Sequence, residues 1–318
     1  MRVTLVYNPV SGGGTGRAAA ERAAEAFRAA GHDAEPIAWE AERGASQIAF
    51  EAAESGADRV VAVGGDGTAV DVAAGLLAAS RLVPMAHVPR GTANVLALNL
   101  GIPTGLRRAI AIAVGGVEAR IDVGEMRAAQ APEGRPFLLS LSTGLHAEMV
   151  ERADRAAKRR WGVLAYLRAG WPAIGVTPRT RYHIRLDGEA IEAEGTMIQV
   201  MNMGAVLRRS WRLAPGISPV DGKLDVIVYG ATTLREYLAV MSRVVQGRPT
   251  ATDLVLHRAA ARVAIDAEPV APVQLDGEIV GLTPARVEVR PRALAVIVPA
   301  RSGWPQSGHE TESGATTA

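Results

Sequence analysis

The first third of the chain alternates strand-like and helix-like patterns, and this alternation limits the fold more than any other feature of the sequence. Short apolar runs predict strands at 3–7, 34–39, 60–63 and 82–88. Helical patterns lie between them at 17–30, 45–55 and 69–79. Strands separated by helices are typical of a parallel sheet covered by helices on both faces. Ligands of such sheets bind beyond the carboxyl ends of the strands.

Three loops lie at those strand ends, at residues 8–17, 64–68 and 89–94, and each is rich in glycine or small hydroxyl residues. A strand that ends in glycines and turns into a helix offers bare backbone N–H groups to a phosphate. One such loop is also common as a plain connection. Three that converge predict a phosphate-binding site.

The middle loop, Gly64-Gly65-Asp66-Gly67-Thr68, contains a carboxylate. A loop that binds only anions should avoid one, so Asp66 implies a cation shared with the phosphates. A Mg²⁺-nucleotide fits that requirement, because Mg²⁺ is held by one or two carboxylates together with substrate phosphates. The loop therefore predicts phosphoryl transfer.

After about residue 120 the pattern changes to strand-like alternation, interrupted by helical patterns at 147–173 and 233–246. The alternating segments cover 137–142, 181–186, 191–203, 224–229 and much of 255–298. This series of alternating apolar and polar segments predicts an antiparallel β-sandwich. The expected fold class is α/β, with an N-terminal Rossmann-like parallel-sheet domain and a C-terminal antiparallel β-sandwich domain.

Composition excludes several classes of site and partner. The 318-residue chain has no cysteine, which rules out disulfides, thiolate zinc sites and cysteine nucleophiles. A net charge of +2 argues against nucleic-acid binding through a broad basic field. No signal peptide or membrane-spanning apolar run is visible, so we expect a cytoplasmic protein, or one peripheral at the inner membrane face.

The motifs, in their order, resemble the diacylglycerol kinase catalytic-domain family and, within it, the bacterial two-domain lipid kinases. The resemblance runs from Val3 to about Pro299. It is carried by Asn8-Pro9 with Ser11-Gly12-Gly13-Gly14, Gly64 to Thr68, Pro89-Arg90-Gly91-Thr92-Ala93-Asn94, Asp221-Gly222-Lys223-Leu224-Asp225 and Asp276-Gly277-Glu278. The middle loop alone also occurs in NAD kinases, whereas the full series is narrower.

The resemblance implies ATP-dependent, Mg²⁺-dependent phosphorylation of a lipid hydroxyl, that of diacylglycerol or a related lipid. It implies a nucleotide-binding diacylglycerol kinase catalytic domain at 1–122 and a lipid-binding β-sandwich at 123–300, with the active site between them. Whether the last strand returns to the first domain is left open, and 301–318 has the composition of a disordered tail. Two alternatives also remain open: an NAD kinase, and a nucleotide- or lipid-binding regulator without catalysis.

The cofactor-binding residues expected for ATP and Mg²⁺ lie in the three loops. They are Asn8, Ser11, Gly12, Gly13, Gly14, Arg17, Gly64, Gly65, Asp66, Gly67, Thr68, Ala69, Val70, Gly91, Thr92 and Asn94. The glycine N–H groups would hold phosphate oxygens, and Arg17 would add a fixed positive charge. The chain departs from the family at Val70-Asp71, where Asn-Glu is frequent, at Ala38, where a threonine is frequent, and at Val95, where an aspartate is frequent.

The expected catalytic residues are Glu278, Asp276 and Asp66. By resemblance Glu278 is the base for the acceptor hydroxyl, Asp276 helps to hold metal or water, and Asp66 orients Mg²⁺. Whether Asp66 or Glu278 is the general base is left open. The same tripeptide occurs at Asp187-Gly188-Glu189, and spacing alone makes both copies hairpin turns, since Asp-Gly is a hairpin signal. Only the family match prefers the second copy.

A second, structural Mg²⁺ is implied at Asp221, with the backbone carbonyls of Ser218 and Lys223. The alternative is a plain turn before the strand at 224–229. A basic segment at 152–171 contains Trp161 and Trp171 at helical spacing, which fits a membrane surface or a solvated helix whose tryptophans are core. The expected partners are ATP and a lipid substrate at the membrane surface. The identity of the lipid, the use of ATP rather than another nucleotide, and a homodimer are left open.

Overall fold

The computed structural model describes residues 1–144, 179–206, 208–246, 252 and 254–300. The N-terminal part contains β1 (Arg2–Tyr7), α1 (Ser11–Gly14), α2 (Gly16–Ala29), β2 (Asp33–Ala38), α3 (Ala45–Glu54), β3 (Arg59–Gly64), α4 (Asp66–Ala78), β4 (Met85–Pro89), α5 (Val95–Leu100) and α6 (Leu106–Gly115). The middle part contains β5 (Val117–Ala128), β6 (Ala131–Phe137), β7 (Ser140–Gly144), β8 (Thr180–Leu186), β9 (Glu189–Gly195), β10 (Met197–Met201), β11 (Ala205–Val206) and β12 (Arg208–Arg212). The C-terminal part contains β13 (Leu224–Tyr229), α10 (Leu234–Val245), β14 (Val255–Ala260), β15 (Arg262–Glu268), β16 (Pro272–Leu275), β17 (Glu278–Leu282) and β18 (Ala285–Val298).

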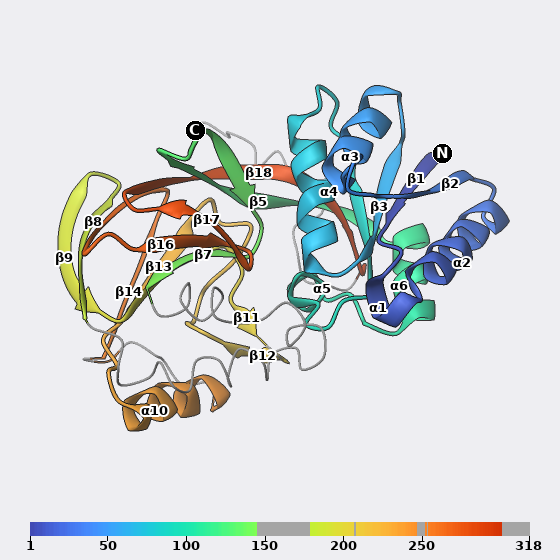
Figure 1. Ribbon diagram of the computed structural model, residues 1–318. Helices are drawn as coiled ribbons and strands as arrows, with labels where there is room; N and C mark the ends of the chain where they lie inside the picture. The colour runs from blue at the N-terminus through green and yellow to red at the C-terminus, as the bar shows by residue number, and fades with distance from the viewer. Residues whose placement is uncertain (145–178, 207, 247–251, 253, 301–318) are drawn as a thin grey trace, which may run out of the picture.

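The predicted parallel sheet is confirmed. Its strands run in the order β2-β1-β3-β4, all parallel. The pair α3 and α4 covers one face, and α2 and α6 cover the other (Figure 1). Strands β1, β3 and β4 are buried on both faces, so they appear in the sequence as continuous apolar runs such as the one from Val60 to Val63.

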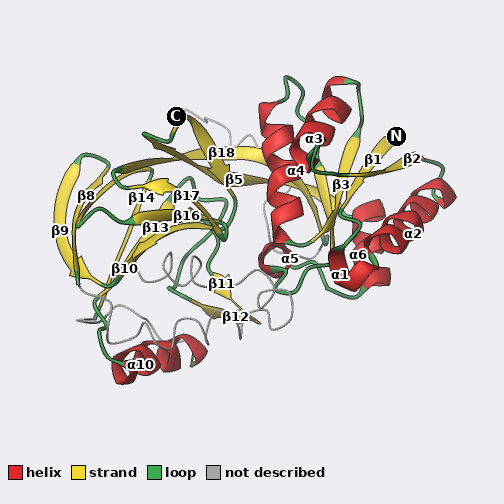
Figure 2. Cartoon of the chain, in the orientation of Figure 1, coloured by secondary structure: helices red, strands yellow, loops and turns green. Residues whose placement is uncertain are grey.

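This sheet does not end at β4, because two long strands carry it into the C-terminal half. In β18, Val296 pairs in parallel with Met85 of β4, and the segment before it pairs antiparallel with β15. Strand β5 pairs with β18 along almost its whole length. One ten-stranded sheet, called the long sheet below, therefore runs through both halves of the molecule (Figure 2).

The predicted β-sandwich is also confirmed, and one of its layers belongs to the long sheet. The second sheet has the strand order β14-β13-β10-β7-β16-β17 and is entirely antiparallel. Between the two layers lies an apolar core that includes Phe137 and Tyr182 from the long sheet and Leu141 and Ile198 from the second sheet. Burying these side chains is the main stabilising contribution of this half.

Two strands predicted as continuous are divided between the sheets. The predicted strand 191–203 breaks at Thr196, with β9 in the long sheet and β10 in the second sheet. The predicted strand 137–142 likewise covers the end of β6 and the start of β7. Both predictions were wrong in the same way, because a chain that crosses between two facing layers keeps its alternation of buried and exposed side chains.

The predicted helix at 233–246 is confirmed by α10. Its N-terminus has a capping box, in which Thr233 Oγ1 accepts the Glu236 N–H at 3.3 Å and Glu236 Oε2 accepts the Thr233 N–H at 3.0 Å. The predicted helix 147–173 and the tail 301–318 lie outside the described residues. Among the residues that the structure describes, no helix is long and apolar enough to span a membrane.

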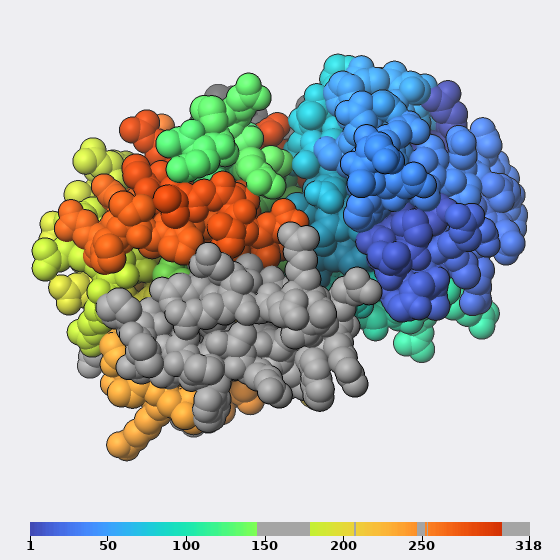
Figure 3. All heavy atoms as spheres, in the orientation of Figure 1, coloured from blue at the N-terminus to red at the C-terminus, as the bar shows by residue number. Residues whose placement is uncertain are grey.

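The first lobe, residues 1–116 with the adjoining ends of β5 and β18, packs directly against the second lobe, which is the rest of the described chain (Figure 3). Asn99 of α5 joins them from the N-terminal side. Its Nδ2 donates to the Ala205 carbonyl and its Oδ1 accepts the Ala205 N–H, both at 3.0 Å. This buried amide pairs with the backbone of β11 as a neighbouring strand would, and it fixes α5, with the loop before it, to the second lobe.

Candidate active site

The structure brings the three glycine-rich loops together at the carboxyl ends of β1, β3 and β4. Arg90 joins the third loop to the first, because its Nη2 donates to Thr15 Oγ1 at 2.9 Å. The third and second loops meet backbone to backbone, since a Cβ placed on Gly91 would lie 2.5 Å from the Cα of Gly65. Any larger side chain at position 91 would therefore push the two loops apart.

The first loop has its backbone turned outward. Gly12, Gly13 and Gly14 have φ angles of 60°, 71° and 93°, and a Cβ on either of the last two would meet nothing within 4 Å. Asn8 shapes the start of the loop, because its Oδ1 accepts the Val10 N–H at 3.0 Å and its carbonyl accepts the Ser11 N–H at 3.2 Å. Such turns present successive N–H groups to an anion.

Two arginines lie beside this loop. The guanidinium of Arg17 lies over the ring of Tyr7, 5.9 Å from its centroid. The Nε of Arg90 is buried and has no hydrogen-bond partner among the described residues. Arg17 was predicted from the sequence as a phosphate ligand, and Arg90 was not. The signal available was a cation directly beside the glycine of the third loop.

The third loop is closed by Asn94. Its Oδ1 accepts the Gly91 N–H and its Nδ2 donates to the Gly91 carbonyl, both at 2.8 Å. Asn94 is 7% exposed, whereas Thr92 is exposed at the tip of the loop. The loop is therefore held in one shape, with Thr92 facing solvent.

The second loop is shorter than predicted, because α4 begins at Asp66 rather than at Ala69. Gly67 is exposed in the first turn, and Thr68 is buried. Ala69 belongs to the core of the first lobe and Val70 packs against that core. Gly67 is therefore the most open position of the segment 64–70.

Asp66 lies between the second loop and α5. Its Oδ2 accepts the Val95 N–H at 3.0 Å and its Oδ1 accepts the Leu96 N–H at 2.9 Å. Burial raises the pKa of this carboxyl, and these two hydrogen bonds oppose the rise. Asp66 thus caps α5 in place of Asn94, which makes no side-chain cap.

Asp276 is the counterpart of Asp66 in the second lobe. Its carboxylate accepts the N–H groups of Leu138, Leu139 and Ser140, at 2.8 to 2.9 Å. Burial raises its pKa to about 6, the three N–H groups oppose the rise, and the charge of Asp66 adds to it. Two partly buried carboxylates, one from each lobe, therefore lie close enough to repel each other.

Glu278, two residues further on, is exposed. Its Oε2 lies 3.8 Å from Nη2 of Arg135 on β6, and its side chain is 76% exposed. Burial raises the pKa of Asp71 on α4, the charge of Glu278 raises it further, and Arg135 lowers it. Asp71, Arg135 and Glu278 thus form a charged cluster where α4 packs against β6. Neither Asp71, which in the sequence is a departure from the family pattern, nor Arg135 was predicted as a site residue.

The predicted second cation site lies at a separate turn before β13. Asp221 Oδ1 accepts the Lys223 N–H at 3.0 Å, while Asp122 Oδ2 accepts the Gly222 N–H at 2.7 Å. Burial raises the pKa of Asp221, and the charges of Asp225 and Asp122 add to the rise. The described residues contain no group of three His, Cys, Asp or Glu side chains arranged to hold a metal ion. The basic segment 152–171 lies outside the described part of the chain.

Two family models match the chain, one for each half. The model "Diacylglycerol kinase catalytic domain" matches residues 2–126, and "YegS C-terminal NAD kinase beta sandwich-like domain" matches residues 139–298. The residues between the two matches, 127–138, cover the end of β5, the hairpin, β6 and the residue after it, where the chain leaves the long sheet.

Three relatives and one solved structure show what the chain is similar to. The chain is 26% identical to a diacylglycerol kinase of Bacillus subtilis, over 94% of this chain and 96% of that protein. It is 30% identical to a "Probable lipid kinase YegS-like" of Pseudomonas fluorescens, over 87% of this chain and 89% of that protein. An uncharacterized protein of Synechocystis is 32% identical, and the chain spans 54% of its length. A crystal structure of a diacylglycerol kinase from Bacillus anthracis has the same fold, with a TM-score of 0.71, 19% identity and coverage of 93% of this chain and 96% of that one.

Proposed function

Because this chain belongs to the diacylglycerol kinase family, in its two-domain bacterial lipid kinase type, we propose that it transfers the γ-phosphate of ATP to the hydroxyl of a lipid, diacylglycerol or a related one. One observation carries the proposal. Asp66 of the second loop lies near enough to Asp276 of the second lobe for its charge to raise the pKa of Asp276, and the charge of Glu278 likewise raises the pKa of Asp71 on α4. A phosphate donor in the loops would thus face carboxylates of the other lobe.

The loops would bind the phosphates mainly through backbone N–H groups. Gly12 to Gly14 offer an open backbone, and Gly67 is exposed at the start of α4, where the helix dipole favours negative charge. The buried Nε of Arg90 lacks a partner among the described residues, and a phosphate oxygen would supply one. Asn8, Ser11 and Asn94 would then act by holding the loop shapes, and Thr92 would contact the nucleotide.

The residues present fit a Mg²⁺ ion shared with the phosphates. Asp66 and Asp276 are partly buried carboxylates with raised pKa values, and neither has an ion pair with a described residue. Oxygen ligands of this kind, few in number, are what Mg²⁺ uses when phosphates and waters complete its shell. When bound, the ion would neutralise charge on the transferred phosphate. Asp221, with the carbonyls of Ser218 and Lys223, is proposed to hold the second cation.

Glu278 is proposed to accept the proton of the lipid hydroxyl. Positioning supplies most of the rate in phosphoryl transfer, and a general base adds about 10²- to 10⁴-fold. Arg135 and Asp71 would act through Glu278 as positioning residues, because Arg135 lies 3.8 Å from its carboxylate and the charge of Asp71 interacts with it. An exposed carboxylate suits an acceptor that arrives from a membrane surface.

The lipid is proposed to be taken from the membrane surface, with the protein peripheral to it. In support, a lipid acceptor with a long apolar body resides in the membrane, so the enzyme has to bind it at that surface.

The test is a phosphorylation assay with ATP and three acceptors: diacylglycerol vesicles, NAD and no acceptor. We expect phosphate on the lipid, detected by mass spectrometry, and its loss in Glu278→Gln. Phosphorylation of NAD alone would overturn the lipid assignment. Nucleotide binding without any phosphorylated product would instead favour a regulator. Repeating the assay with GTP and with a panel of hydroxyl lipids would define the donor and the acceptor.

A further inference from the structure

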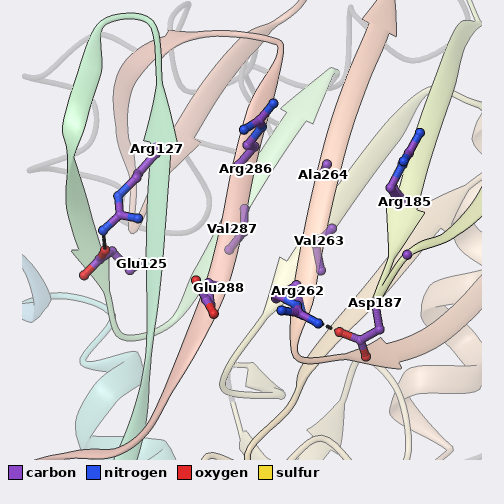
Figure 4. Close-up of a pocket in the computed structure, with 11 residues that line it drawn as sticks. Glu125, Arg127, Arg185, Asp187, Arg262, Val263, Ala264, Arg286, Val287 and Glu288 are labelled. Atoms are coloured by element: carbon purple, nitrogen blue, oxygen red, sulfur yellow. Dashed lines mark hydrogen bonds and ion pairs between the residues drawn. The ribbon is translucent and has the colours of Figure 1, made fainter.

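A groove of about 470 Å³ crosses the outer face of the long sheet, on the side away from the sandwich core (Figure 4). Its floor is formed by outward-facing residues of β5, β18, β15 and β8. Val263 and Val287 lie below this floor and belong to the core. The groove therefore lies on a rigid, well-packed layer.

One row across these strands is almost entirely cationic. Ala264 of β15 pairs with Arg185 of β8 on one side and with Arg286 of β18 on the other, and Arg286 pairs with Arg127 of β5. Because neighbouring strands lie about 4.8 Å apart, the backbones of Arg185 and Arg286 are about 10 Å apart. The small side chain of Ala264 leaves the space between the two arginines open (Figure 4).

The arginines that line the groove differ in whether their guanidinium groups have a partner. Arg127 Nη2 lies 2.6 Å from Glu125 Oε1, so its charge is compensated. The guanidinium groups of Arg185, Arg262 and Arg286 have no hydrogen bond or ion pair with any residue that the structure describes. Three free cations thus line the groove.

Two of the three acidic residues of the groove already have partners. Glu125 binds Arg127 and also lies 3.3 Å from Arg290. Asp187 accepts the backbone N–H groups of Ala261 and Arg262, at 2.8 to 3.2 Å. Glu288 is the one lining carboxylate without a partner among the described residues. Four arginines against three carboxylates give the lining a net charge of +1, and the three guanidinium groups without partners favour an anion such as a phosphate.

We propose that this groove binds the phosphate headgroup of an anionic lipid, with the guanidinium groups of Arg185 and Arg286 on either side of the phosphate. Arg donates to phosphate oxygens in a paired, planar geometry, and the Arg–Ala–Arg row provides two such donors across an open floor. The lipid source is favoured because the row follows an exposed sheet face that a membrane surface can approach. Identification of the partner as a lipid rests on the proposed function, whereas binding itself requires no catalysis.

The experiment measures flotation of the full chain with vesicles of phosphatidylcholine containing phosphatidic acid, without ATP. We expect Arg286→Gln and Arg185→Gln each to weaken binding about fivefold or more, since each cation near an anionic surface contributes on that scale. Arg181→Gln is the matched control. Arg181 lies on the same strand and the same face, its side chain is 57% exposed, and it lies 3.6 Å from Glu194, outside the groove. It removes the same charge and should change binding less than twofold.

Two further arms distinguish headgroup binding in the groove from catalysis and from a general loss of stability. Glu278→Gln should bind the vesicles as the unchanged protein does, so a failure of the proposed kinase activity does not imply a failure of the groove. The groove variants should keep wild-type melting temperatures and wild-type turnover of a dispersed short-chain diacylglycerol. Equal losses in Arg181→Gln and Arg286→Gln would overturn the proposal. A second result would also overturn it. If the protein does not bind the vesicles, but nuclear magnetic resonance shows binding of inorganic phosphate that is lost in Arg286→Gln, the ligand is free phosphate and not a lipid.

Discussion

The tripeptide Asp-Gly-Glu occurs in two hairpins of this protein, and the two turns have the same backbone. The φ angles are 49° and 102° at Asp187 and Gly188, and 45° and 100° at Asp276 and Gly277. Each turn joins two antiparallel strands, β8 to β9 and β16 to β17. Two residues with positive φ are what a type I′ turn requires, and Asp-Gly is a preferred pair for it.

The turns differ in what surrounds them. Asp187 accepts two backbone N–H groups at an exposed edge of the long sheet. Asp276 accepts three, where the chain crosses from β6 to β7, and it lies near Asp66 of the other lobe. Local sequence thus determines the turn, and distant segments determine what its carboxylates can do.

The largest expected effect concerns the glutamates. We predict that Glu278→Gln lowers kcat about 10²- to 10⁴-fold, because it removes the proposed base and keeps the shape of the side chain. Glu189→Gln, the matched change in the other hairpin, should leave kcat within twofold. Initial rates of lipid phosphorylation at saturating ATP measure both. Equal effects of the two substitutions would show that Glu278 has no special role.

The next effect concerns stability. Asp276→Ala removes the acceptor of three N–H groups in a buried crossing, which we expect to cost about 3 kcal/mol in the free energy of unfolding. Asp187→Ala should cost about 1 kcal/mol or less, because water can replace its carboxylate at the exposed edge. Urea unfolding at pH 7 compares the two variants. A larger loss in Asp187→Ala would contradict the assignment of Asp276 as the buried anchor.

A third effect is the pH dependence of that anchor. Since the pKa of Asp276 is raised to about 6 in the folded chain, the folded state binds more protons than the unfolded state between about pH 4 and pH 6. The stability that Asp276 contributes therefore falls as pH rises through this window. Buried His87, whose pKa is lowered to about 4, contributes the opposite slope, so total stability alone cannot report on Asp276.

The gap in unfolding free energy between the unchanged protein and Asp276→Ala isolates the carboxyl, because the His87 contribution cancels. We predict that this gap shrinks by about 2 kcal/mol between pH 4 and pH 7. Urea titrations in buffers with a chelator measure it without interference from divalent cations. A gap that stays constant or widens with pH would mean that burial does not control this carboxyl.

The sequence predicted the repeating features of the fold correctly, because those depend on neighbouring residues. The strand and helix periods gave β1 to β4 with their helices, β13 and α10. They did not separate β9 from β10, because an alternating pattern continues when the chain passes from one layer of a sandwich to the other. Such a crossing depends on which strands are already paired on each side.

The contacts that the candidate site residues make could not be predicted from the sequence, for a related reason. The three loops could be found from glycine content at strand ends. That Asp66 caps α5, that Asp276 binds the N–H groups of residues 138–140, and that Arg135 lies beside Glu278 are contacts between distant parts of the chain. They follow from how distant segments and the two lobes pack together, and the local sequence pattern carries no information about that packing. The roles of these residues therefore remain predictions for the experiments above.

The smallest expected effect tests the premise that the two turns have the same backbone. A Cβ on Gly188 or on Gly277 would meet nothing within 4 Å, so Gly→Ala at either position adds strain at positive φ and no steric clash. We expect each substitution to lower the free energy of unfolding by about 1 to 2 kcal/mol, with the two values within about 0.5 kcal/mol of each other. Urea unfolding measures the costs, and lipid phosphorylation separates the functions. Gly277→Ala should also lower kcat several-fold, because strain relieved by a shift of the turn moves Glu278, whereas Gly188→Ala should not. A difference of more than about 1 kcal/mol between the two losses in unfolding free energy would contradict this premise. It would mean that a distant contact at one of the turns changes its backbone and not only the surroundings of its side chains.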